Sequence, residues 1–498
     1  MERLVLTSAQ KALKINLNEN IYGTFAEIGA GQEVVRHFFR AGGASGTVAK
    51  TMSAYDKDFS DAIYGKEVDG RYVTEPRLRK MVAREYGLIE ERLDRSKYPN
   101  KCYFSFANTV ATINFTRKFK GHGWMGLRFQ LHPNQEPNDI IFHIRMKEEE
   151  ASLQQETIGV MGVNLIYGAF YIRNNPEELL KSLYDNIAPY KMEIDMIHFE
   201  GPEFRQVDNR LMSLQLLKNG FTDAVIFGPE GKNILPAALL YKKNILAMRG
   251  SFRPVTKVNI DMIKKGIEYF INERKVDKEK MVVLFEITLN NLKAEGEIDE
   301  QDFLDRAEIL CSLGQTVLIS NYQQYYKLVE YFTRYTEERM GLIMGVTNLK
   351  DLFDERYYRD LKGGILEAFG ILYSTDLKLY IYPYQPKPED ELATSESLKI
   401  NPRLKPLYDY LMFNRRIIDI ETYDPEILRI FSREVLRRIK QGKTGWEKGL
   451  PAYVDNIIRD KRLFGYKPEN YKENEATREV GSWAMGLDGR GWRLEVRG

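Results

Sequence analysis

Eight short, mostly apolar runs rich in β-branched residues alternate with helix-like stretches through the middle of this chain. Runs of this length and composition are typical of parallel strands that are covered on both faces. Most of them are followed by an amphipathic stretch long enough for a crossover helix. The pattern predicts an α/β fold with a (β/α)8-barrel-like central domain over residues 156–385. The predicted strands are 158–167, 194–200, 224–228, 245–249, 281–287, 316–321, 341–346 and 377–383.

An N-terminal α+β domain is predicted before the barrel, over residues 1–155. We expect one helix at 21–40, which a pair of glycines ends, and a second at 75–93. Three strand-like runs follow, and the last two flank a turn-rich segment, which indicates a hairpin. These predicted strands are 102–109, 123–131 and 139–146.

The chain after the predicted barrel divides into a helical region and a tail. A polar, proline-bearing linker begins at Pro386, and we assign residues 386–474 to a C-terminal helical region. Its predicted helices are 404–414, 425–441 and 451–462. Residues 475–498 differ in composition, with tryptophans among several glycines, and form an atypical tail of either native or vector origin. We leave this tail out of the fold prediction.

The composition is that of a globular protein, with 43% hydrophobic and 29% charged residues. A net charge of +2 argues against strong attraction to nucleic acid or to an anionic membrane. No apolar run is long enough to span a bilayer, and the N-terminus lacks the apolar core of a signal peptide. Cys102 and Cys311 lie far apart and lack metal-ligand spacing, so we expect reduced core thiols. We therefore expect a cytoplasmic protein without a membrane or nucleic-acid partner.

Polar side chains follow the ends of the predicted strands, where the working residues of such barrels lie. The candidates for general acid–base catalysis are Glu200, Glu286 and His198. The candidates for binding an anionic substrate are Arg249, Arg253, Lys232, Asn321 and Asn348. Two alternatives stay open: every barrel has a polar rim, and the two arginines also suit ion pairs with Glu200 or Glu286.

Two glycine-containing segments are candidates for phosphate binding. Gly363 and Gly364 lie between the last two predicted strands and are candidate substrate-binding residues, since they can present free amides at a helix start. The alternative is a simple helix break. The segment 42–50 is a candidate nucleotide-binding loop, although it lacks the P-loop spacing, and tight helix packing explains its small residues equally well. Its candidate cofactor-binding residues are Gly43, Ser45, Gly46 and Lys50.

Three histidines, His122, His132 and His143, lie close together in the sequence. The first two are ten residues apart, and an extended strand of that length spans roughly 33 Å. In the predicted hairpin, His143 pairs near Phe129 rather than beside either of them. We therefore expect no three-histidine metal site, and the sequence indicates neither a metal nor a particular cofactor.

Four segments resemble an uncharacterised bacterial protein family, some members of which are labelled nicotinate-nucleotide adenylyltransferase. They are GTFAEIGAGQE at 23–33, GASGTVAKTMSAYD at 43–56, GSFRPVTKV at 250–258 and CSLGQTVLISNY at 311–322. Adenylyltransferases of that name resemble one another through a His-x-x-His motif after a first Rossmann strand, and this sequence has no such motif. The resemblance therefore implies that most of residues 15–385 belong to one protein type, and it implies no mechanism.

The leading functional prediction is a cytoplasmic enzyme, of transferase or lyase type, that acts on a small phosphorylated or carboxylated metabolite such as a nucleotide or a sugar phosphate. A non-catalytic oligomeric scaffold and a nucleotide-binding regulatory protein are the alternatives. We also predict a homo-oligomer, because tyrosines gather at 322–326 and 357–358, and tyrosine is favoured at interfaces. The alternative is that these tyrosines pack the interior of one chain.

Overall fold

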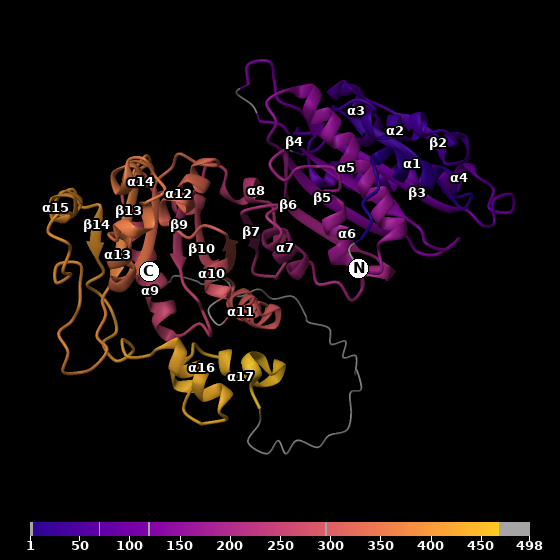
Figure 1. Cartoon of the computed structure of the whole chain (residues 1–498). Helices are drawn as coiled ribbons and strands as arrows, with labels where there is room; N and C mark the ends of the chain where they lie inside the picture. The colour runs from indigo at the N-terminus through magenta and orange to yellow at the C-terminus, as the bar shows by residue number, and fades with distance from the viewer. Residues whose placement is uncertain (1–2, 69, 118–119, 294–295, 468–498) are drawn as a thin grey trace. The chain divides into compact units, whose positions relative to one another are not determined.

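A computed structural model describes residues 3–68, 70–117, 120–293 and 296–467 of the chain. The chain divides into two compact units (Figure 1). The first runs to Ile226 and includes Lys232–Ala238 and Ile319–Asn321, and the second comprises Phe227–Gly231, Leu239–Leu318 and the chain from Tyr322 onward. The first unit therefore extends well past the predicted boundary at residue 155. The predicted tail at 475–498 lies outside the described residues.

The first sheet is mixed, with the strand order β2-β1-β3-β4-β5-β6. Strand β1 pairs in parallel with β2 and β3, and each later neighbour pairs antiparallel. The predicted strands at 102–109, 123–131 and 139–146 and their hairpin are confirmed as β3, β4 and β5. The strands are β1 (Ile21–Ile28), β2 (Val48–Met52), β3 (Cys102–Ala111), β4 (His122–Phe129), β5 (Asn138–Met146) and β6 (Met192–Glu200).

Helices cover both faces of the first sheet. One face packs on α1 (Ser8–Asn16), α2 (Glu33–Ala41), α5 (Ala151–Tyr171), α6 (Pro176–Ser182) and α7 (Asn209–Lys218). The other packs on α3 (Lys57–Tyr64) and α4 (Glu75–Arg92). Apolar side chains of alternate strand residues fill both interfaces, since successive side chains of a strand point to opposite faces.

Two predictions for the first unit are wrong. The run 158–167 is the centre of helix α5, which is buried on nearly all sides, and an all-apolar helix cannot be told from a buried strand by periodicity. The predicted helix at 21–40 is strand β1, a turn and helix α2. Gly29 and Gly31 in that turn have φ angles of +85° and +77°, which only glycine adopts easily, so the helix cannot begin earlier.

The second sheet is open, with the strand order β14-β13-β12-β9-β10-β11-β7-β8 among the described residues. The pairs β9–β10, β9–β12, β12–β13 and β13–β14 are parallel. The strands are β7 (Ala224–Phe227), β8 (Asn233–Ile234), β9 (Asn244–Arg249), β10 (Met281–Thr288), β11 (Thr316–Ser320), β12 (Met340–Gly345), β13 (Leu377–Tyr382) and β14 (Ile417–Asp419).

Six strands, β9 to β14, follow the order of a doubly wound α/β sheet. The chain runs from β9 outward to β10 and β11, then returns to the other side of β9 and continues outward through β12, β13 and β14. A doubly wound nucleotide-binding sheet has this order. Its connections carry α9 (Lys257–Phe270), α10 (Leu289–Leu292), α11 (Glu300–Ser312), α12 (Tyr325–Thr333), α13 (Val346–Leu352), α14 (Gly364–Leu372) and α15 (Lys405–Phe413).

The α/β class is confirmed, and the prediction of one closed barrel is wrong. Of the eight predicted strands, six lie in the open second sheet, the run 194–200 is β6 of the first sheet, and 158–167 is helical. A barrel and a doubly wound sheet share the same alternation of strands and helices along the chain. They differ in which strands, far apart in the sequence, pair with one another, and the local sequence pattern does not indicate that pairing.

The C-terminal helices are partly as predicted. The helix at 404–414 is α15, and the one at 451–462 is α17 (Val454–Lys461), whereas that at 425–441 begins only with α16 (Ser432–Lys440). The short α8 (Pro236–Leu240) follows β8. Both cysteines are buried and free, as predicted. Within the described residues, no helix combines the length and the apolar character needed to cross a membrane.

Candidate functional site

Arg249 and Glu286 form a buried ion pair at the carboxyl edge of the second sheet. They stand directly opposite each other in the pairing of β9 with β10. Arg249 Nε and Nη2 donate to the two carboxylate oxygens of Glu286 over 2.8 and 2.9 Å, and Nη1 donates to the carbonyl of Gln323 over 2.7 Å. The Glu286 side chain is fully buried and that of Arg249 is 8% exposed. This contact confirms, for Arg249, the alternative raised from the sequence that the arginines form ion pairs with Glu200 or Glu286.

An aromatic ring completes the environment of this pair. The Arg249 guanidinium lies over the ring of Tyr325, 4.3 Å from its centre, which suits a cation–π contact. Burial disfavours the charge of Arg249, but Glu286 outweighs that effect and raises its pKa. Burial raises the pKa of Tyr325 to about 12, and Asn348 from α13 also interacts with this tyrosine. Arg249, Glu286 and Asn348 are thus brought to one edge, as predicted.

A second buried network fixes the loop that follows β9. Arg253 donates through Nε to Asp302 of α11, and Arg306 donates to the same carboxylate. Arg306 Nη1 also donates to the carbonyls of Ser251 and Asn291, each over 3.1 Å. Burial lowers the pKa of Arg306, although Asp302 opposes the shift. These contacts make the loop rigid and occupy Arg253 with a carboxylate.

The other predicted catalytic residues do not join this edge. Glu200 and His198 lie on β6 of the first sheet. Arg79 donates to both oxygens of Glu200, over 3.0 and 2.7 Å, and this pairing lowers the pKa of Glu200. Burial lowers the pKa of His198. Glu200 therefore lies on a different sheet from Arg249 and Glu286, because the run 194–200 forms the antiparallel edge strand of the first sheet and not a strand of the second.

The remaining predicted substrate-binding residues lie in separate loops. Lys232 lies between β7 and β8, and the amide of Asn321, directly after β11, donates to the carbonyl of Asp223 over 2.8 Å. The amide of Gly363 donates to Glu367 of the same helix over 2.7 Å. Gly364 then begins α14. The Gly363 amide, a candidate for binding phosphate, is therefore already bonded to a side chain of α14. This contact supports the alternative of a helix break.

The glycine-containing loop at 42–50 packs against the first helix. A Cβ on Gly43 would meet Asn16 at 3.5 Å, and the Asn16 amide donates to the carbonyl of Gly42 over 2.7 Å. Ser45 and Gly46 form part of a short 3-10 turn. Lys50 is paired with the buried carboxylate of Glu85. These contacts support the packing alternative over a nucleotide cradle.

The sequence did not reveal a row of three side chains in contact across the first sheet. His122 Nδ1 lies 3.1 Å from His143 Nε2, and His143 Nδ1 lies 2.6 Å from Asp195 Oδ1. The predicted register was wrong, because His143 stands opposite Trp124 and not Phe129. His122 stands opposite Arg145, and the two histidines are therefore diagonal neighbours.

Glu27 is a second residue that the sequence did not single out. It is fully buried at the end of β1 and accepts the amides of Val34 and Val35, over 3.2 and 3.1 Å, at the start of α2. Asn108 donates to it over 3.0 Å. Burial raises the pKa of Glu27 to about 7, although these donors oppose the shift. The group thus titrates near neutral pH inside the first unit.

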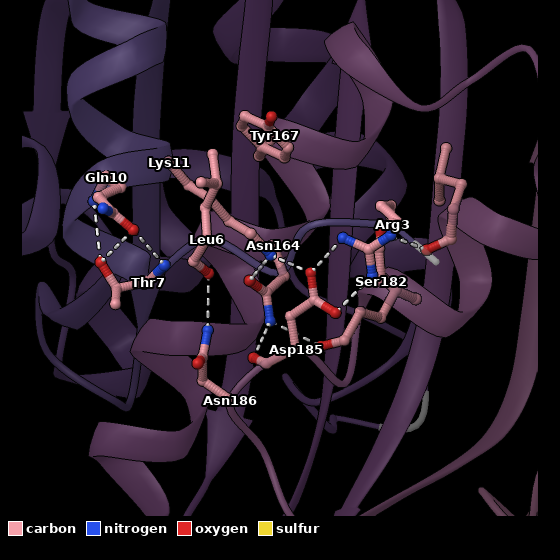
Figure 2. A network of polar contacts seen from close by, with 12 residues as sticks. Arg3, Leu6, Thr7, Gln10, Lys11, Asn164, Tyr167, Ser182, Asp185 and Asn186 are labelled. Atoms are coloured by element: carbon pink, nitrogen blue, oxygen red, sulfur yellow. Dashed lines mark hydrogen bonds and ion pairs between the residues drawn. The ribbon is translucent and has the colours of Figure 1, made fainter. Parts of the chain in front are cut away.

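Figure 2 shows a charged network near the N-terminus. Two of its members, Arg3 and Asp185, also line a cavity of about 680 Å³. Lys11 is fully buried and donates to Asn164 over 2.7 Å and to Asp185 over 2.6 Å. Both terminal nitrogens of Arg3 donate to the same carboxylate. Burial disfavours the ionised form of Asp185, but Arg3 and Lys11 outweigh that effect and lower its pKa. The charges satisfy one another, and the network fastens α1 to α5.

No group of three or more His, Cys, Asp or Glu side chains in the described part of the chain is arranged to hold a metal ion.

No protein-family model and no curated protein matches the chain. Solved structures that resemble part of it include the competence/damage inducible protein CihA from Agrobacterium tumefaciens, with 14% identity, 33% of this chain, 97% of that chain and a TM-score of 0.24. A CinA superfamily protein from Enterobacter cloacae shows 10% identity, 34% and 95% coverage and a TM-score of 0.24. The Escherichia coli CinA superfamily protein shows 12% identity, 31% and 81% coverage and a TM-score of 0.21.

At these identities and TM-scores the similarities carry no argument about activity. None of the three is named a nicotinate-nucleotide adenylyltransferase, the label found among proteins that resemble this sequence.

Proposed function

We propose that the protein is a cytoplasmic enzyme that acts on a small phosphorylated or carboxylated metabolite, such as a nucleotide or a sugar phosphate, at the carboxyl edge of the second sheet between β9 and β12. The observation that carries the proposal is the strand order. Strand β9 lies between β10 and β12, so the connections that leave β9 and β12 diverge to opposite sides. Ligands of open α/β sheets bind in the crevice that such a divergence creates.

Small and polar residues line the two loops at this position. Ser251 follows β9, and its side chain is exposed. Gly345 ends β12, and the exposed Thr347 and the half-buried Asn348 follow it. Hydroxyl and amide groups of this kind fix the orientation of a small ligand in a binding site. The rigid loop after β9, held by Asp302 and Arg306, keeps Ser251 in place.

Arg249 and Glu286 have a positioning role in this proposal. Glu286 is fully buried and bound at both oxygens by Arg249, so it is not placed to take a proton from a substrate. The pair instead fixes the ends of β9 and β10, next to the crevice. In this proposal the ligand that undergoes the transferase or lyase reaction is held between the loop after β9 and the loop after β12.

A steric block at Gly345 tests the proposal. A Cβ at Gly345 would have only the side chains of Thr347 and Asn348 near it, at 4.0 Å, so Gly345→Val should fold and fill the crevice. Gly370→Val on α14 is the matched control, because a Cβ there meets nothing within 4 Å. Calorimetric titration with nucleoside monophosphates, sugar phosphates and inorganic phosphate should find a probe that binds the wild type and the control equally.

The expected result is that Gly345→Val weakens binding of that probe by about tenfold or more, which corresponds to 1.4 kcal/mol. Equal binding by Gly345→Val would place the ligand elsewhere. Failure of every probe to bind the wild-type protein would also count against the proposal.

A further inference from the structure

The cavity that Arg3 and Asp185 line has a volume of about 680 Å³ and lies in the first unit. Its other lining residues belong to the end of α5, to the turn that follows it and to α6. Sites for small molecules have volumes of about 300–1,000 Å³. We infer that the cavity binds a neutral molecule with several hydroxyl groups, such as a monosaccharide or a cyclic polyol, and that this site is separate from the crevice in the second sheet.

Among the described residues, the charged side chains that line the cavity are paired with one another. Arg3 donates through its two terminal nitrogens to the carboxylate of Asp185, over 2.7 and 2.6 Å (Figure 2). Lys181 donates to Glu178 Oε1 over 3.1 Å. Two cations and two carboxylates leave this lining without net charge. A neutral ligand therefore suits the cavity better than an anion or a cation, whose charge would have no counterpart.

One hydrogen-bond donor of these side chains has no acceptor. Arg3 Nε is buried and makes no hydrogen bond to the described part of the chain. Glu178 Oε2 lies 3.8 Å from it, which is too far for a hydrogen bond. A hydroxyl group both accepts and donates, so one ligand hydroxyl can accept from Arg3 Nε and donate to Glu178 Oε2. Such a group would remove the cost of leaving a buried donor without a partner.

The turn between α5 and α6 adds two amide side chains to the lining, Asn174 and Asn175. Asn175 Oδ1 accepts the backbone amide of Glu178 over 3.1 Å and so caps α6. This bond fixes the direction of the Asn175 side chain, whose Nδ2 is a donor. The side chain of Asn174 is exposed and carries both a donor and an acceptor. A ligand with several hydroxyl groups needs such a mixture, because each hydroxyl donates and accepts.

Tyr171 and Ile172, at the end of α5, form the less polar part of the lining. The Tyr171 hydroxyl accepts from Asn18 over 3.2 Å and donates to the carbonyl of Lys14 over 3.3 Å. Its ring stacks on that of Tyr167, with ring centres 4.9 Å apart. These contacts hold the tyrosine in place. A sugar carries C–H groups beside its hydroxyls, and small-molecule sites combine apolar walls with a few fixed polar groups.

Saturation-transfer NMR, which detects the signals of a bound ligand, tests the inference with glucose, ribose and myo-inositol as probes. At least one probe should receive saturation from the wild-type protein, and a titration then gives its dissociation constant. Alanine, a small zwitterion, should not displace that probe, because the charged groups of the lining already pair with one another. Failure of all three probes to bind, or displacement by alanine, would overturn the inference.

Two substitutions locate the bound probe. Glu178→Ala removes the carboxylate acceptor and should weaken binding by about tenfold or more, the effect of a hydrogen bond to a charged group. Arg3→Lys keeps a cation for Asp185 but removes Nε, and it should weaken binding to a similar degree. The matched control is Glu177→Ala, at the neighbouring residue of α6 outside the lining, which should bind as the wild type does.

Wild-type affinity in Glu178→Ala, or equal weakening in Glu177→Ala, contradicts the inference. Glu178→Ala should fold, because the Glu178 side chain is 36% exposed and its pair with Lys181 is of the kind that contributes little to stability. This variant therefore decides the test if Arg3→Lys does not fold. A folded Arg3→Lys protein with wild-type affinity also contradicts the inference.

The Gly345→Val variant separates this site from the proposed function. It fills the crevice in the second sheet and should leave the binding of the neutral probe unchanged. Loss of that binding in Gly345→Val would place the probe in the second unit, and the inference would fall while the proposed function stood.

Discussion

At the scale of single residues, the Arg249–Glu286 pair shows how a charged residue can lie at a ligand-binding edge without binding a ligand. Both oxygens of Glu286 and three nitrogens of Arg249 are already engaged within the chain. Removing one partner of a buried pair leaves the other charge without compensation. Replacing both partners with neutral groups of similar shape is often close to neutral.

We therefore predict that Arg249→Ala lowers the free energy of unfolding by about 3–5 kcal/mol, the usual cost of breaking a buried pair. The double variant Arg249→Met with Glu286→Gln should recover most of that loss. Urea denaturation of the three proteins measures it. A cost of less than about 1 kcal/mol for Arg249→Ala, typical of an exposed pair, would contradict the buried role.

The residue scale is also where the sequence was least informative. Arg249 and Glu286 were predicted to converge because both end apolar runs, and strand ends of a parallel sheet meet at one edge. The contact of His122 with His143 depends instead on the register of an antiparallel hairpin. A change of register alters every cross-strand neighbour, and the sequence of the turn did not fix it.

At the scale of elements, the β1–α2 turn joins a buried carboxylate to the start of a helix. Glu27 accepts the amides of Val34 and Val35, which have no partner within the helix so close to its start. Burial nevertheless raises its pKa to about 7, above the usual value of an unfolded glutamate near 4.3. Between these two values the folded state holds a proton that the unfolded state has lost.

Stability should therefore fall as the pH rises from about 4.3 to 7, because the folded state binds more protons in that window. The contribution of Glu27 to that fall is about 4 kcal/mol at most, and it is complete above the folded pKa. Urea denaturation at several pH values in this range measures the free energy of unfolding. That free energy should fall less steeply with pH in Glu27→Gln than in the wild type. Glu19→Gln, at an exposed residue just before β1, is the control and should keep the wild-type dependence on pH.

Elements with a distinct local signal were predicted well. Strands β3 to β5 combine apolar runs with a turn-rich connection, and β9 to β13 each precede an amphipathic stretch. Helix α5 was missed because it is apolar on every face. Gly162 there packs so closely on α2 that a Cβ would lie 2.4 Å from Val34. Such a helix has no polar face from which its period can be detected.

At the scale of the whole molecule, the number of strands was predicted more successfully than their arrangement. The order β12-β9-β10 requires the chain to return across β9 after β11. After β11 the next strand could add either beside β11 or on the other side of β9. Both arrangements have the same alternation of strands and helices along the sequence. The proposed ligand crevice depends on this one choice, so it could not be predicted from the sequence.

Self-association is the last prediction, and its basis changes with the structure. Of the tyrosines on which the prediction was based, those at 322, 325, 326 and 358 are buried in the second unit and pack its interior, and only Tyr357 is exposed. Exposed aromatic side chains occur on α15, where Tyr410 is 64% and Phe413 is 89% exposed. Residues three apart on a helix share one face, so these two rings lie on the same exposed face of α15.

We predict a two-fold symmetric dimer that buries this face of α15, since closed symmetric pairs are the commonest assemblies. Light scattering behind size exclusion should give twice the chain mass of 58.0 kDa at micromolar concentration. The double variant Tyr410→Glu with Phe413→Glu should give the mass of one chain, because a two-fold interface would bury four like charges without partners. Tyr241→Lys, an exposed tyrosine at the end of α8, is the control and should remain dimeric. A single-chain mass for the wild type would refute the dimer, and a dimeric double variant would place its interface elsewhere.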